Sequence, residues 1–406
     1  MTSEITSRTL PIVFICTISI VLFSLVSVIF PALIISITSP LAEVELFEFG
    51  ALTIPFLIIS FVLFSIGILY KQNKLSETIS NGINFILDFE ISKNLTIIIG
   101  IVLLIIYIGF TIPELLVDES EQIPDYWVFE QAYKIWPFGQ AELPHIEEQN
   151  DRFVKMALLI FSLEILENVK IIPFVFSILV IIITYFLTRE LSQKRFAGII
   201  SMIIVLQSYT FLRYDTIAIY DNFWTMFYLL SLYFILKKWY LSGISYILSI
   251  FSKAFSLTFL PMSLFVIFKS KITLRKKILI CATYASVLIT TIIIWQMDQT
   301  LYPKILEFDT TAFWIGFTKW SYQMRFDFLL MFTILPLIVG LFYKAKQKII
   351  GAEIVMFLIL GGLFAGPFVE LFTNFYVTFP YRFVPLVVFF AIGVGIILGK
   401  RLTYRS

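Results

Sequence analysis

The sequence predicts an all-α, polytopic membrane protein, and two observations support this fold class. The first is composition: 59% of the 406 residues are hydrophobic, only 14% are charged, and the mean hydropathy is +0.93. The second is spacing, because apolar runs long enough to cross a bilayer recur along the chain. The small net charge of +2 is spread over the segments between these runs and forms no basic patch, so no nucleic-acid partner is expected.

The apolar runs predict about twelve transmembrane helices. They fall at 10–37, 50–69, 96–113, 170–187, 196–212, 222–236, 240–252, 254–268, 278–296, 326–343, 351–369 and 382–399. The first run is too long for a cleavable signal. We divide the chain into 1–95, two extra N-terminal spans and a soluble loop, and 96–406, the main membrane domain. Cys16 and Cys281 lie inside apolar runs and are interpreted as small core residues.

The basic residues predict the orientation. If the spans alternate, Lys71, Lys74 and Lys93 share one side with the basic run 269–277 and with the C-terminal lysine and arginines. The positive-inside rule makes that side cytoplasmic. Both termini are then expected inside the cell membrane, and the loop 114–169 outside.

The loop 114–169, called the cap below, begins with the most acidic stretch of the chain. Its basic residues up to position 155 are Lys134, Arg152 and Lys155. Its acidic residues are Glu114, Asp118, Glu119, Glu121, Asp125, Glu130, Glu142, Glu147, Glu148 and Asp151. In a chain with so few charges, this clustering marks the region beneath the cap as the place where chemistry is expected.

The cap is expected to contain two amphipathic surface helices. Tyr126, Phe129, Tyr133 and Trp136 recur at helical spacing between Pro124 and the Pro137–Gly139 pair, which favours a helix with its rings at headgroup level. These rings could alternatively stack on a sugar. The second helix is expected from about 151 to 167. It would carry an apolar side formed by Phe153, Ala157, Ile160 and Phe161.

Two neighbouring spans are abnormally short. The runs 240–252 and 254–268 each reach only about 20 Å at 1.5 Å per residue, against a hydrocarbon core of about 30 Å. They meet at Lys253, whose charge at membrane depth costs roughly 2.5–3.5 kcal/mol unless water or an anion compensates it. Lys253 either caps a helix hairpin and reaches water, or forms part of an anion site. We favour the anion site.

Several ionisable residues are expected at the outer membrane level, where such groups usually face a cavity or pair with one another. They are Asp118, Glu119, Arg213, Asp215, Asp221, Lys253 and Arg382. Two simpler interpretations stay open. Arg213 could form a structural ion pair with Asp215 or Asp221, and Asp118 could be a solvated acid at a helix end.

Opposite charges in a pocket at lipid level suit the transfer of a sugar from a lipid phosphate. The cations would stabilise the departing phosphate, and a carboxylate would take the proton of the acceptor hydroxyl as it attacks the anomeric carbon. One displacement with one base predicts inversion at that carbon.

The order of these features resembles the GT-C glycosyltransferases, in particular the protein O-mannosyltransferase and aminoarabinose-transferase branch. The segments that carry the resemblance lie in order between residues 96 and 400. They are VDES, FSILVIIITYFLTREL, FLRYDTIAIYDNFWTMFYLLSLYFILKK, ISYILSIFSKAFSLTFLPMSLFVIF and YRFVPLVVFF.

The resemblance implies a GT-C-like membrane domain that moves a sugar from a polyprenyl-phosphate donor to a protein or lipid acceptor on the outer face. Asp118 would be the catalytic base and Glu119 its neighbour. Lys253, Arg382 and Arg213 are the candidates for binding the donor phosphate. Asp215, Asp221 and His145 are assigned to the pocket.

The chain departs from the branch in three places. His145 stands in LPHIEEQN, where the branch often carries His-Pro-Pro, and alone it is more typical of a surface residue. The spans at 10–37 and 50–69 have no counterpart. No large soluble domain like the one that some members carry after the last span is expected, so acceptor recognition is assigned to the cap and the outer loops.

Two other function classes stay open. One is a transporter or flippase of a lipid-linked or anionic solute, although no internal repeat is seen and the break at Lys253 is expected near the outer surface. The other is a non-catalytic assembly subunit with this fold. Mg²⁺ or Mn²⁺ could bind Asp118, Glu119 and Glu121, but neighbouring acids on an exposed loop more often serve solubility. No metal site is assigned.

Overall fold

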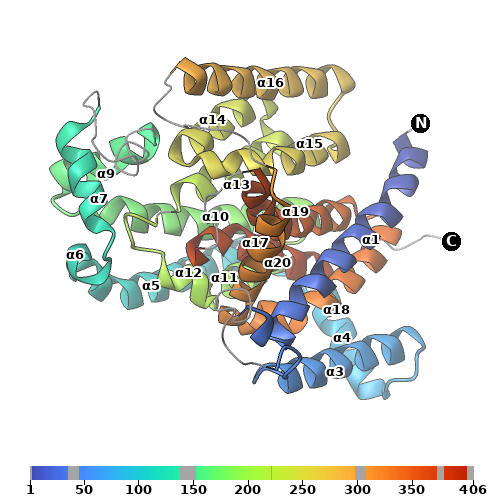
Figure 1. Cartoon of the computed structure of the whole chain (residues 1–406). Coiled ribbons are helices and arrows are strands. Elements are labelled where there is room, and N and C mark those ends of the chain that lie inside the picture. Colours follow the sequence, from blue (N-terminus) through green and yellow to red (C-terminus); the bar gives the residue numbers. More distant parts are fainter. Residues whose placement is uncertain are drawn as a thin grey trace. The chain divides into compact units, whose positions relative to one another are not determined.

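A computed structural model describes residues 2–34, 45–137, 152–220, 222–297, 308–372 and 379–399 (Figure 1). Every regular element in these ranges is a helix. The chain divides into two compact units. Unit 1 comprises 1–98, 184–210 and 307–406, and unit 2 comprises 99–183 and 211–306.

Unit 1 is built around α19. This helix packs against α1, α17, α18 and α20, while α20 also packs against α11 and α18. The elements of unit 1 are α1 (Thr2–Ile29), α3 (Thr53–Lys71), α4 (Glu77–Asp88), α11 (Arg195–Leu206), α17 (Thr310–Tyr322), η3 (Gln323–Phe326), α18 (Phe328–Lys346), α19 (Ile350–Phe372), η4 (Pro380–Phe383) and α20 (Val384–Ile397). It also holds the start of α5 and the end of α10.

Unit 2 contains the cap and the short helices near Lys253. Helices α13 and α14 pack closely together, and α16 lies beside α14 and α15 (Figure 1). The elements are α5 (Lys93–Leu115), α6 (Glu119–Gln122), α7 (Tyr126–Ile135), α9 (Phe153–Leu166), α10 (Ile171–Ser192), α12 (Tyr209–Arg213), α13 (Phe223–Lys237), η1 (Trp239–Leu241), α14 (Ser242–Ser252), η2 (Ala254–Phe259), α15 (Leu260–Lys269) and α16 (Leu274–Met297). Helices α5, α10 and α12 cross the boundary between the units.

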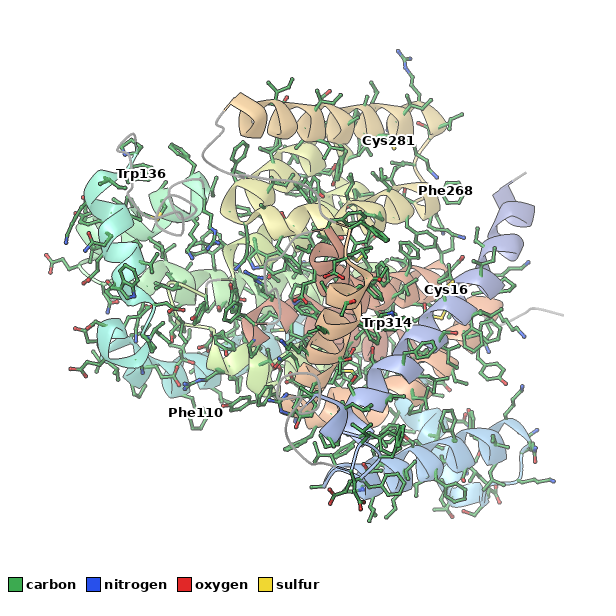
Figure 2. All side chains as sticks on the ribbon, in the orientation of Figure 1. Cys16, Phe110, Trp136, Phe268, Cys281 and Trp314 are labelled. Carbon is green, nitrogen blue, oxygen red and sulfur yellow. The ribbon has the colours of Figure 1, made fainter. Side chains whose placement is uncertain are left out.

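The structure confirms a helical, multi-pass membrane character. Within the described residues, 7 helices are long and apolar enough to cross a bilayer. They are 9–29, α3, α5, α10, α18, α19 and the segment 380–397. Phe110 illustrates their outer surface, because its ring is exposed and points away from α5 (Figure 2). About twelve spans and a GT-C fold stay predictions.

The sequence-based expectations differ from the structure at three places. The segment between α3 and α5 was expected to be a soluble loop but contains α4, and α17 was not expected at all. Cys16 and Cys281 are free thiols, but neither is a core residue, since Cys16 is exposed on α1 and Cys281 is half-buried on α16.

Glycine allows α17 and α19 to approach each other closely. A Cβ atom built on Gly366 of α19 would lie 2.6 Å from the ring of Trp320 on α17. The indole of Trp320 also donates a hydrogen bond of 3.1 Å from Nε1 to the carbonyl oxygen of Gly362. Small residues at such crossings let helices in a membrane gain van der Waals contact.

Candidate functional site

Asp118 lies at an exposed helix start in the cap. It is the N-cap of α6, and its Oδ1 accepts hydrogen bonds of 2.9 Å from both the backbone N–H and the hydroxyl of Ser120. These bonds favour the ionised form, so the pKa of Asp118 is lowered. The structure therefore supports the helix-end interpretation and leaves an ionised carboxylate accessible to a ligand.

Glu119, the next residue, is directed into the protein. It is only 2% exposed, and its two carboxylate oxygens accept hydrogen bonds from the backbone N–H groups of Ala218 (2.9 Å) and Ile219 (3.0 Å). Burial raises the pKa of Glu119, although the two hydrogen bonds oppose that shift. With both oxygens bonded to backbone, Glu119 holds the segment 214–220 against the cap.

Lys155 of α9 binds the same segment from its other side. Its buried ammonium donates a hydrogen bond of 2.5 Å from Nζ to the carbonyl oxygen of Ile219. Ile219 thus has its N–H bonded to Glu119 and its C=O bonded to Lys155. The sequence reasoning missed this role, although an isolated lysine in the apolar run FVKMALL was a signal of the same kind as Lys253.

The four rings expected along the first cap helix pack against a core of unit 2, and their position at headgroup level stays a prediction. Phe129 and Ala132 are buried in one core, and Tyr126, Tyr133 and Trp136 pack against it. The other members of this core are Ile123, Val128, Met156, Leu159, Val169, Ile217, Ala218, Ile219 and Phe223. Trp136 contacts Phe153 at the start of α9, with ring centroids 5.3 Å apart. The segment 217–219 is an apolar packing partner of these rings, and its distance in the sequence kept it from being predicted.

The second expected cap helix is α9, but its buried side differs from the expected apolar side. Met156 and Leu159 face the core, while Phe153 and Phe161 of the expected side are exposed together with Ile165. Helix α9 also packs against α14, the helix that ends next to Lys253. The cap is therefore joined to the broken hairpin within unit 2.

Asp215 is a buried carboxyl group rather than an exposed partner of Arg213. It is 2% exposed, and its Oδ2 accepts hydrogen bonds from the hydroxyls of Tyr107 (2.7 Å) and Thr111 (3.5 Å) on α5. Its Oδ1 is buried without a hydrogen-bond partner among the described residues. Burial is the main reason that the pKa of Asp215 rises to about 7, and the nearby Glu114 adds to the shift.

The raised pKa of Asp215 gives a pH-dependent stability. Between about pH 4 and about pH 7 the folded chain keeps a proton that the unfolded chain has lost, so stability falls with rising pH by at most about 1.4 kcal/mol per unit. Asp215→Asn should remove this contribution. The unfolding temperature of both proteins is measured from about pH 4 to about pH 7, and the difference between them gives the contribution of Asp215. The same pH dependence in both proteins would contradict a raised pKa of Asp215.

The other predicted site residues fall into different settings. Arg213 is exposed at the end of α12 in unit 2. Arg382 belongs to unit 1, where it is half-buried in η4 and donates a hydrogen bond of 3.2 Å from Nε to the hydroxyl of Tyr381. Asp221 and His145 lie outside the described residues.

Lys253 occupies a break between two helices, as the sequence predicts. Helix α14 ends at Ser252, Lys253 is extended, and η2 begins at Ala254. The side chain is 3% exposed, so it does not reach solvent as the hairpin-cap interpretation requires. The break is held locally because the carbonyl oxygen of Lys253 accepts bonds from the N–H (3.0 Å) and hydroxyl (2.9 Å) of Ser256.

Three serines lie close to this break in the sequence. Ser249, Ser252 and Ser256 are all buried. The hydroxyls of Ser249 and Ser252 each donate a bond of 2.8 Å to a backbone carbonyl, those of Trp224 and Leu248. The break between α14 and η2 therefore holds a buried lysine with buried serines on either side of it in the sequence.

Lys170 is a further buried cation that the sequence reasoning did not single out. It precedes α10, and its Nζ donates bonds to the carbonyl oxygen of Glu114 (3.1 Å) and to Oε1 of Gln122 (2.7 Å). Glu114 lies in the last turn of α5 and Gln122 is the last residue of α6. Lys170 therefore joins the two helix ends on either side of Asp118. Its position just before an apolar run was the available signal.

The described residues do not gather a metal site. No group of three or more histidine, cysteine, aspartate or glutamate residues is placed to hold an ion there. Of the three acids considered for Mg²⁺ or Mn²⁺, Glu119 already bonds two backbone N–H groups. A divalent cation therefore stays a prediction without a ligand set.

Comparison of the chain with models of protein families, with curated proteins and with solved structures gave no match.

Proposed function

We propose that this chain is a membrane glycosyltransferase that moves a sugar from a polyprenyl-phosphate donor to a protein or lipid acceptor at the outer membrane face. The observation that carries the proposal is the buried cation of Lys253 at a break between two short apolar helices. Basic residues between membrane helices can bind the phosphate of a lipid headgroup.

The cap supplies the second requirement of the reaction. Asp118 is exposed and its pKa is lowered, so it is an ionised carboxylate at neutral pH. We assign it the role of general base towards the acceptor hydroxyl. The proton leaves the hydroxyl for Asp118, the oxygen bonds to the anomeric carbon, and the bond from that carbon to the phosphate oxygen breaks.

The remaining residues would serve this arrangement in different ways. Glu119, Lys155 and Lys170 hold the cap, and Asp215 lies beneath it in the same unit. Lys253 would bind the donor phosphate and stabilise the charge that develops on it. Arg213, which belongs to the same unit as Lys253, stays a candidate for a contact with this phosphate. The assignment of Arg382 to donor binding stays a prediction from the sequence.

Binding of a short-chain polyprenyl phosphate to the purified protein tests the proposal. Wild type should bind it saturably, with affinity that falls at high salt because charge attraction is screened. Lys253→Ala should bind at least about tenfold more weakly, a loss of roughly 1.4 kcal/mol.

Two variants control this measurement. Lys253→Arg keeps the charge and should retain binding, while Lys134→Ala removes an exposed cation from α7 and should behave as wild type. Equal binding by wild type and Lys253→Ala, with both proteins folded, would remove the anion site. The transporter and assembly-subunit interpretations would then be preferred.

A further inference from the structure

Helix α4 is amphipathic, and one side of it is uncovered among the described residues. None of its residues is buried. Ile79 is 52% exposed, Phe85 67% and Ile86 48%, and with Gly82 they form one arc of the helix. The opposite arc carries Ser80, Asn84 and Asp88 with Glu77, and Asn81 lies at the border next to Phe85.

Hydrogen bonds join α4 to the ends of α3 and α20, two candidate membrane helices of unit 1. Asn84 Oδ1 accepts a bond of 2.6 Å from the hydroxyl of Tyr70, in the last turn of α3. Lys194, just before α11, donates from Nζ to the carbonyl oxygens of Leu87 in α4 (2.7 Å) and Leu398 at the end of α20 (3.0 Å). One ammonium thus caps two helix ends.

The segment that follows α4 is held at the same level. Glu90 Oε1 accepts a bond of 3.2 Å from the N–H of Arg195, and the rings of Phe89 and Phe196 meet edge to face at 5.0 Å. Both residue pairs join the end of the α4 segment to the start of α11. Helix α4 therefore lies along the face where α3 and α20 end and α11 begins.

We propose that α4 lies in the interface of a phospholipid bilayer, with Ile79, Phe85 and Ile86 among the acyl chains. Its neighbours in the chain, α3 and α5, are apolar enough to span a membrane, and only a few residues join α4 to each. A helix held at the ends of spanning helices meets the boundary between headgroups and acyl chains. Lys74 and Lys93 are exposed close to its two ends in the sequence, where their stems would cover apolar surface and their charges would reach lipid phosphates.

The lipid contact can be measured with a fluorescent thiol label on the full chain in phosphatidylcholine vesicles. Cys16 and Cys281 are replaced by serine, and single cysteines are introduced as Ile79→Cys, Ile86→Cys or Asn81→Cys. Labels at 79 and 86 should be quenched several-fold more by brominated acyl chains than by aqueous iodide. The label at Asn81 lies about 150° around the helix from both positions but on the side of Phe85, so its preference for acyl-chain quenching should be clearly weaker.

Two results would overturn the proposal. Equal access of iodide to all three positions would place α4 in water. The labels at 79 and 86 could also be shielded from both quenchers while light scattering shows a dimer. That result would show that a second copy covers this face. All three substitutions alter exposed side chains, so they should leave the fold intact.

Discussion

Asp118→Asn is expected to reduce sugar transfer about 100- to 10,000-fold, the usual contribution of a general base. The variant should fold normally, because asparagine and aspartate are comparable N-caps and the bond from the Ser120 N–H is kept. The amide, however, cannot take up the acceptor proton. Turnover of a polyprenyl-phosphate sugar by purified wild type and variant measures the effect.

Glu121→Gln provides the matched control for this prediction. Glu121 is exposed on the same short helix, so it tests whether any loss of an acid from the cap lowers the rate. It should retain full transfer. A wild-type rate for Asp118→Asn would refute the base assignment even if Lys253 binds the donor.

Glu119→Ala is expected to cost about 2–5 kcal/mol of folding free energy. The change removes the acceptor of the buried N–H groups of Ala218 and Ile219, and each unsatisfied group costs roughly 1–3 kcal/mol. It also removes the electrostatic attraction between Glu119 and the ammonium of Lys155. Thermal unfolding in detergent, together with proteolysis of the cap, measures the loss.

Glu121→Ala again serves as the control and should unfold at the wild-type temperature. If Glu119→Ala were as stable as wild type, water would have to satisfy the two N–H groups. The segment 214–220 would then not be held by the cap. Reduced transfer in a stable Glu119→Ala protein would instead favour a direct role of this carboxylate.

The helix break at Lys253 and the two cap helices could be predicted because their signals are local. Two apolar runs too short to cross a bilayer meet at one charge, and the structure ends α14 and begins η2 on either side of it. Pro124 and Pro137 likewise bracket α7. Signals of this kind depend only on spacing, length and backbone chemistry.

The roles of the cap residues could not be predicted, because their partners are distant in sequence. Lys155 binds a carbonyl 64 residues away and Glu119 binds an N–H 100 residues away. Helix α17 could not be predicted for a different reason. Its buried face of Gly316, Phe317 and Trp320 is interrupted by Thr318 and Lys319, so no continuous apolar run marks it.

The N-cap of α6 has a consequence for how this kind of protein could change over generations. A single nucleotide exchange converts an aspartate codon into an asparagine codon, and asparagine fits the position that Asp118 fills at the helix start. A gene copy altered in this way would still encode a stable, membrane-inserted chain. Selection on folding alone would not remove it, so gene copies that lack this carboxylate would persist even if the carboxylate is needed for function.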